Sequence, residues 1–175
     1  TETEQMNSLI SKIENKIELL KEKRRSLINY YVTNGIENNA DMKDSGVDWI
    51  GKIPSTWEVK KLKYLASEII EKRKSNSKDI RISPENVESN SGKIVNYYAD
   101  YEGDGKVFLE GDILFNKLRV YLNKVIFCQF QGLSMGEMIV IRPKYIFGEF
   151  LHKVLSSSKF IDHINSFSQG VKVPR

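Results

Sequence analysis

A single heptad seam runs through the first 31 positions, and no glycine or proline interrupts it. The seam positions step by four and three: Met6, Ile10, Ile13, Ile17, Leu20, Arg24, Leu27 and Tyr31. This spacing predicts one continuous helix over about residues 4–33, roughly 45 Å long. The Asn34-Gly35 pair that follows is a typical helix C-terminal signal. We therefore assign residues 1–35 to a coiled-coil spacer helix.

Such a helix cannot bury its seam against itself, and the rest of the chain offers no second heptad run. The partner helix must come from another chain or from a part of the protein outside this sequence. Arg24, a cation within the seam, would then fix the register or meet an acid across the interface. A lone amphipathic helix folded onto the following domain is the weaker alternative, because the helix is so long.

The remaining chain divides into a connector, 36–57, and a domain, 58–175. Turn-forming pairs such as Ser-Gly and Pro-Ser punctuate the connector. At 62–73 the apolar spacing favours a short helix over an extended segment. Six β-like runs follow it: DIRIS, GKIVNYY, KVFL, GDILF, KVIFCQF and EMIVIRP.

Helical periodicity returns at 147–167, where Ser156-Ser157-Ser158 indicates a break between two helices. The predicted fold class is α+β: a long coiled-coil-forming helix followed by a mainly β domain with packed helices.

The composition indicates a folded protein outside the membrane, with 40% apolar and 29% charged residues. No apolar run approaches the roughly 20 residues that a membrane span needs, and the opening TETEQ is not a signal peptide. The single cysteine, Cys128, lies in an apolar run and predicts a buried thiol in a reducing, cytoplasmic setting. One cysteine permits neither an intramolecular disulfide nor a CxxC zinc site. We expect no cofactor and no metal.

The net charge of +4 is unevenly distributed. Residues 60–82 contain eight Lys or Arg and three Asp or Glu. Residues 83–115 contain two basic and seven acidic residues, and residues 116–175 contain nine basic and three acidic residues. Two basic segments around an acidic one suit a protein with one positive face for a polyanion. On charge alone, an ordinary solvated surface explains the distribution about as well as a binding face for a polyanion.

The stretch NKLRVYLNK, 116–124, alternates apolar and polar residues. In an extended chain, successive side chains point to opposite sides. One side could therefore join a core while Lys117, Arg119, Tyr121 and Asn123 face outward. A surface edge strand whose cations deter pairing with other strands has the same pattern.

Three stretches together resemble the specificity subunit of Type I restriction-modification systems. They are KIENKIELLKEKRRSLINYYVTNGI, then DMKDSGVDWIGKIPSTWEVKKLKYLA, then GDILFNKLRVYLNK with EMIVIRP. In that family two target recognition domains are each followed by a long helix, and the helices form an antiparallel coiled coil. Each domain reads one half of a split DNA sequence, while the helices set the spacing and dock methyltransferase subunits.

The resemblance implies that this chain is the central helix followed by the second recognition domain. It would be a non-catalytic subunit whose partners are double-stranded DNA, the methyltransferase and restriction subunits, and a second helix. That helix would come from the missing part of the subunit or from another copy. Val120 departs from the family, which often has proline after the arginine of the KLR motif.

The resemblance also implies which polar side chains face DNA. Lys117 and Arg119 would contact phosphates, or guanine in the case of arginine, and Tyr121 would bind a phosphate or stack. Asn116 and Asn123 would read adenine, with Lys124 beside them. A second cluster of basic residues is also a candidate for binding DNA phosphates: Lys72, Arg73, Lys74, Lys78 and Arg81. A solvated loop without a DNA contact is nearly as favoured for this cluster.

Two other classes of function remain open. A magnesium-dependent nuclease would use Asp100 and the Asp104-Gly105-Lys106 motif, with Asp79 or Glu102 in support; the Asp-Gly pair is better predicted as a hairpin turn. A coiled-coil adaptor would explain the helix but not the skewed charge. His152 and His163 lie eleven residues apart, so we expect solvated or capping roles rather than metal binding.

Overall fold

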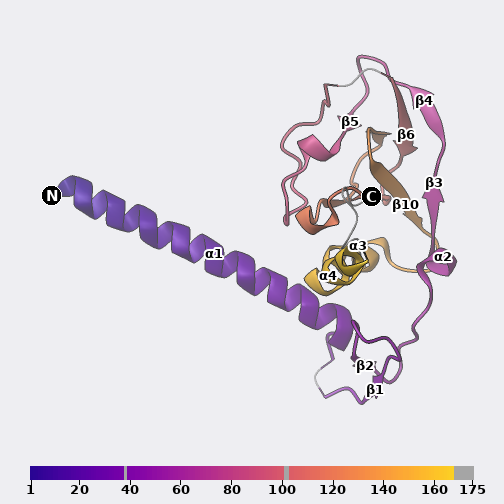
Figure 1. The fold of residues 1–175 in the computed structure, drawn as a ribbon, viewed down its shortest axis with the longest axis horizontal. Helices are drawn as coiled ribbons and strands as arrows, with labels where there is room; N and C mark the ends of the chain where they lie inside the picture. The colour runs from indigo at the N-terminus through magenta and orange to yellow at the C-terminus, as the bar shows by residue number, and fades with distance from the viewer. Residues whose placement is uncertain (38, 101–102, 168–175) are drawn as a thin grey trace.

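The N-terminal part of the long helix projects away from the rest of the molecule, and its C-terminal end lies against the domain (Figure 1). The computed structural model describes residues 1–37, 39–100 and 103–167. Helix α1 spans Glu2–Asn34, and only Val32 and Thr33 at its C-terminal end are buried. Gly35 ends it with φ of 72°, donating its N–H to the Tyr31 carbonyl at 3.1 Å. The predicted helix and its C-terminal signal are confirmed.

The predicted connector contains regular structure. Strands β1 (Met42–Asp44) and β2 (Lys52–Pro54) pair antiparallel as a hairpin beside the end of α1. Ile53 is buried there. The turn signals in this segment were therefore correctly identified, but the extended residues between them pair with one another instead of forming an irregular linker.

Two four-stranded sheets form the body of the domain. The first is antiparallel throughout, in the order β3 (Ala66–Ile69), β10 (Met138–Pro143), β7 (Ile113–Asn116), β8 (Val125–Phe127). The second is mixed, in the order β4 (Lys72–Lys74), β6 (Asp104–Phe108), β9 (Gly132–Ser134), β5 (Arg81–Ile82). Its β5 and β9 run parallel. Two short 3₁₀ turns occur at Pro84–Asn86 and Val120–Leu122.

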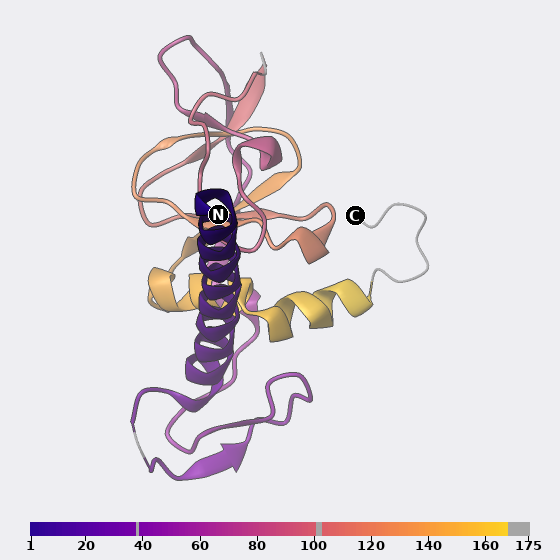
Figure 2. The same cartoon turned by 90° about the vertical axis from the view of Figure 1, so that its left-hand side faces the viewer.

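Helices α3 (Gly148–Ser156) and α4 (Ser158–Ser166) cover the first sheet. Seen along α1, they cross behind its C-terminal half, between the β1–β2 hairpin and the strands (Figure 2). Ser157 separates them, and its hydroxyl caps α4 by accepting the Phe160 N–H at 3.3 Å. The predicted helical segment and its serine break are confirmed.

The core has two principal layers, because β7 is buried on both faces. Ile113 and Phe115 pack with α3 and α4, whereas Leu114 packs with residues of the second sheet such as Ile82 and Phe108. Helices, first sheet and second sheet therefore stack in order. The predicted α+β fold class is confirmed.

Three local predictions are wrong. Only α2 (Leu62–Leu65) is helical within 62–73, because pairing with β10 makes 66–69 extended. The run 92–98 forms isolated bridges rather than a strand. Tertiary pairing overrides local propensity at both places.

The Asp104-Gly105 pair is the third wrong prediction, because it lies within β6 rather than at a hairpin turn. A Cβ on Gly105 would lie 2.5 Å from Met135 Sδ and 2.8 Å from Leu133 Cβ. Glycine is required there by the close approach of β6 to β9.

The single cysteine is fully buried, as predicted. Burial raises the pKa of the Cys128 thiol to about 12, so it stays protonated at neutral pH. Among the described helices, none is long and apolar enough to cross a bilayer.

Neither histidine is freely solvated. His163 stacks on Trp49 with ring centroids 5.5 Å apart. His152 Nε2 lies 3.3 Å from the Val125 carbonyl, to which it donates in the neutral ring. Burial, followed by the nearby charge of Lys153, lowers the pKa of His152 to about 4. The predicted solvated role is therefore wrong for His152.

The neutral state of His152 predicts an acid-sensitive fold. Its pKa rises to about 6.5 on unfolding, so below that pH the unfolded chain binds the extra proton and stability falls. The loss should reach about 3 kcal/mol by pH 4, since each pH unit is worth about 1.4 kcal/mol. Urea unfolding between pH 7 and pH 5 measures the first part of this loss, about 2 kcal/mol. That window lies above the one in which Asp79 titrates, whose folded pKa is about 2. His152→Gln should flatten the dependence; an equal slope in both proteins would contradict the assignment.

Candidate nucleic-acid interface

The stretch 116–124 is a compact loop rather than an extended strand. Strand β7 ends at Asn116, and a 3₁₀ turn over Val120–Leu122 follows. Arg119 (φ 54°) and Asn123 (φ 47°) adopt left-handed backbone conformations on either side of it. The predicted alternation is therefore wrong beyond β7, because these two residues reverse the chain and remove the two-residue periodicity.

Three polar side chains of this loop hold its shape. Asn116 is buried, and its Nδ2 donates to the Leu118 carbonyl at 2.7 Å. Asn123 Nδ2 donates to the Ser156 carbonyl at 2.8 Å, and Lys124 Nζ to the Pro84 carbonyl at 2.7 Å. The amides predicted to read adenine are thus engaged in intramolecular hydrogen bonds, which sequence alternation could not show.

The other three predicted side chains are exposed: Lys117, Arg119 and Tyr121. Lys117 Nζ lies 3.2 Å from Glu137 Oε2, in an ion pair whose two side chains are both about half exposed. Such a pair contributes little to stability and exchanges readily for another anion. All three side chains are therefore accessible to a ligand, which Lys117 could meet by leaving its ion pair with Glu137.

A groove of about 810 Å³ opens beside the loop. Arg119 and Lys124 come from the loop, and Glu85 comes from the facing 3₁₀ turn. Asn116 of the loop also contributes, and the remaining polar lining comes from residues that sequence reasoning did not select for DNA contact: Ser83, Asn86, Asn96, Tyr98, Asp100 and Glu137. Of these, Asn96 and Tyr98 belong to the run that was wrongly predicted as a strand.

The groove carries both hydrogen-bond donors and acceptors. Its two cations, Arg119 and Lys124, face three carboxylates, Glu85, Asp100 and Glu137. A guanidinium matches guanine, an amide matches adenine, and a carboxylate accepts from the cytosine amino group. An excess of carboxylates disfavours phosphate. The lining therefore suits base edges better than a sugar-phosphate backbone.

The second basic cluster does not form one patch. Its first three cations lie exposed on β4, whereas Arg81 lies on β5, and these are the two edge strands of the second sheet. Arg73 is bound to Asp79 through two hydrogen bonds of 2.7 Å, which lower the pKa of Asp79 to about 2. Lys72, Lys74 and Lys78 remain exposed.

The lysine of the nuclease alternative is held by other groups, and its Asp104 lies within a strand. Lys106 Nζ donates to the Met138 carbonyl at 3.0 Å and lies 3.8 Å from Glu68. Asp104 pairs with Lys74 in the sheet. Within the described ranges, no three histidine, cysteine or acidic side chains form a group that could hold a metal ion. Glu102 lies outside the described residues.

No known protein family matches the chain, and no curated protein does. A chain from a solved type I restriction–modification (R-M) system is similar to it in structure, with 24% sequence identity and a TM-score of 0.46. That match covers 55% of this chain and 27% of the neighbour, so the matched part spans about a quarter of the neighbour's length. The work describing that system concerns its complex assembly and conformational transition.

Proposed function

We propose that this chain is the DNA-recognition part of a Type I restriction–modification specificity subunit, a non-catalytic protein that reads one half of a bipartite target. The groove beside the 116–124 loop is the observation that carries the proposal. It is concave, about 810 Å³, and offers a guanidinium, amides, a phenol and carboxylates from four separate segments. That combination supports direct readout of base edges.

Within this proposal, residues 1–35 form the spacer helix and 58–175 the recognition domain. The seam side chains from Met6 to Leu20 are exposed, as expected of a helix that buries its apolar face only on association. The helix would dock the methyltransferase subunits and a second helix. The β1–β2 hairpin lies between these two parts and packs beside the end of α1.

Arg119 and Lys117 should have different roles on DNA. Arg119 lines the groove, and its planar guanidinium can donate to two guanine acceptors at once. Lys117 lies outside the lining and carries a point charge suited to phosphate. Arg119→Ala should cost about 1–3 kcal/mol on the preferred site and relax preference at one base pair. Lys117→Ala should weaken binding to all duplexes about equally. It should also reduce the slope of log affinity against log salt concentration by about one.

The measurement begins with selection of preferred duplexes from a randomised pool. Both variants are then titrated against the selected and scrambled duplexes at several salt concentrations. Lys43→Ala, on the exposed β1 strand, is the control and should change neither quantity. Unchanged affinity and preference in both variants would place the DNA-reading face elsewhere. Absence of any duplex binding by the wild type would reject the proposed function.

A further inference from the structure

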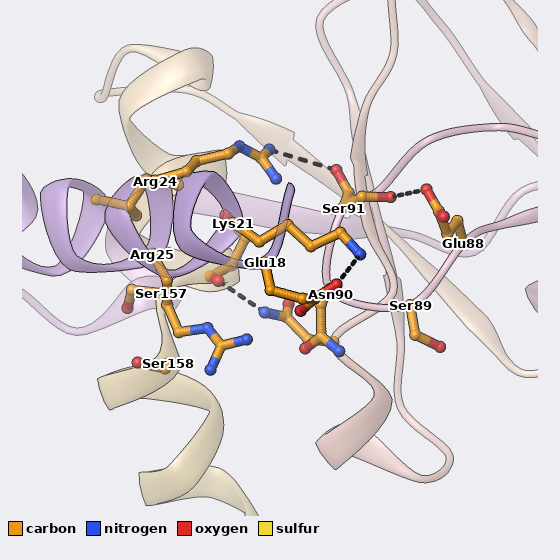
Figure 3. A pocket seen from close by; sticks show the side chains of 13 residues that line it. Glu18, Lys21, Arg24, Arg25, Glu88, Ser89, Asn90, Ser91, Ser157 and Ser158 are labelled. Carbon is orange, nitrogen blue, oxygen red and sulfur yellow. Dashed lines mark hydrogen bonds and ion pairs between the residues drawn. The ribbon is translucent and has the colours of Figure 1, made fainter. Parts of the chain in front are cut away.

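A second hollow lies between α1 and the globule, the folded domain formed by the sheets with α3 and α4. The turn 88–91 and the loop 116–124 separate this hollow from the groove. It measures about 220 Å³ and is lined by α1, by the turn 88–91, and by the junction of α3 and α4. Figure 3 shows Lys21, Arg24 and Arg25 extending from α1 into this cleft, with Ser91 and Asn90 opposite. Sequence reasoning placed Arg24 in the helix seam and assigned no role to Arg25.

The two arginines carry the available positive charge of the cleft. Lys21 is bound to Glu18 at 2.8 Å, and Glu88 accepts the Ser91 hydroxyl at 2.6 Å. Arg24 donates to the Ser91 carbonyl through a long hydrogen bond of 3.4 Å. Within the described residues, no ion pair involves Arg24 or Arg25. Both arginines line the cleft, and in Figure 3 their guanidinium groups point to different sides of it, that of Arg24 toward Ser91. Each guanidinium can therefore donate charge-assisted hydrogen bonds to an anion.

The cleft and the groove are separated by two segments of chain that are hydrogen-bonded to each other. The Asn90 N–H donates to the Leu122 carbonyl at 3.1 Å, which joins the cleft-lining turn to the groove-lining loop. The hydrogen bond from Lys124 to the Pro84 carbonyl fixes the same two segments further along. An extended ligand in the groove therefore reaches the cleft by crossing a single turn of chain.

We propose that Arg24 and Arg25 bind the phosphate backbone of the duplex whose bases enter the groove. This inference rests on the proposed function, and it adds a DNA contact made by the helix itself. The groove has more carboxylates than cations, so it needs phosphate contacts from outside its lining. The cleft supplies them, since its cations, Lys21, Arg24 and Arg25, outnumber its acids, Glu18 and Glu88. Guanidinium groups bind phosphate through paired, charge-assisted hydrogen bonds.

The assignment changes how the helix works. Its apolar seam stays available to a partner helix, while the neighbouring stripe through Lys21, Arg25 and Ile28 faces the globule and the cleft. In this proposal Arg24 contacts the DNA backbone and does not fix the register of a coiled coil.

The test measures binding of the full chain to a mixed-sequence 30-base-pair duplex across a range of salt concentrations. Arg24→Ala/Arg25→Ala should weaken binding at least about tenfold at 0.1 M salt and flatten the slope of log affinity against log salt by about one to two. Lys16→Ala/Lys23→Ala removes two cations from α1 that do not line the cleft, and it should leave the slope unchanged. Arg24→Lys/Arg25→Lys should restore most of the slope, because charge is retained.

The outcomes separate this inference from the proposed function. If the double alanine variant binds like the wild type while Arg119→Ala still alters base preference, the cleft contact is wrong and DNA recognition stands. Weaker binding with an unchanged slope would show that the arginines act only on structure or meet an acidic protein, and would overturn the inference. A wild type that binds no duplex overturns both. The circular dichroism spectrum and the melting temperature of Arg24→Ala/Arg25→Ala should match those of the control variant Lys16→Ala/Lys23→Ala.

Discussion

Arg142→Met should lower the free energy of unfolding by about 3–5 kcal/mol, the largest single effect expected in the domain. Asp112 is 1% exposed, and its two carboxylate oxygens accept hydrogen bonds from Arg142 Nε and Nη2, each at 2.7 Å. Asp112 Oδ2 also accepts the Leu109 N–H at 2.8 Å. Without the guanidinium, a carboxylate would remain buried and unpaired.

The pair joins two strands at the centre of the fold. Asp112 immediately precedes β7, and Arg142 lies on the neighbouring β10. Methionine keeps the unbranched stem of the arginine side chain up to about the Nε position, so the variant removes the charge while most of the packing of the stem is retained. For a chain of this size, a loss on the order of 4 kcal/mol corresponds to a melting temperature lower by roughly 10 °C.

Urea unfolding monitored by fluorescence measures the effect, with an unchanged m-value as the sign that compactness is preserved. Lys144→Met, two residues away and exposed, is the matched control and should cost less than about 0.5 kcal/mol. Adding Asp112→Asn to Arg142→Met should recover much of the loss, because the buried charge is then removed while the amide still accepts the Leu109 N–H. A loss below about 1 kcal/mol in the single variant would contradict the role of the pair.

Ile17→Asp should abolish association through α1 while leaving the globule folded. Ile13, Ile17 and Leu20 are exposed on the free part of the helix. Burying an unpaired carboxylate in an assembled seam costs several kcal/mol, enough to weaken association by a factor of about a hundred or more. The globule should be unaffected, because the buried residues of α1 are Val32 and Thr33 at the other end.

Sedimentation velocity over a range of concentrations measures the effect, both for the chain alone and with methyltransferase subunits. Asn15→Asp introduces the same charge two residues away, off the heptad seam, and should leave association unchanged. If the Ile17 variant sediments and docks like the wild type, the exposed seam is not an interface. A lower melting temperature in this variant alone would instead show that the free half of α1 supports the globule.

The arrangement of DNA-facing residues was only partly predictable. Arg119 was selected from the alternation of 116–124, and it does line the groove. The alternation itself fails, because the side chain of Asn116 closes a local turn and Asn123 adopts a left-handed conformation. Asn96 and Tyr98 were missed, since nothing local to their sequence indicates that they face Arg119.

Local periodicity alone was enough to predict α1, its end at Gly35, and the α3–α4 pair with its serine break. Helix hydrogen bonds join residues four apart, so these signals lie within a few positions of one another. The groove, the cleft, the Gly105 close approach and the burial of His152 follow only from the tertiary structure. Each depends on segments distant in sequence, such as 83–91 packed against 118–124, and the energy of those contacts outweighs local propensity.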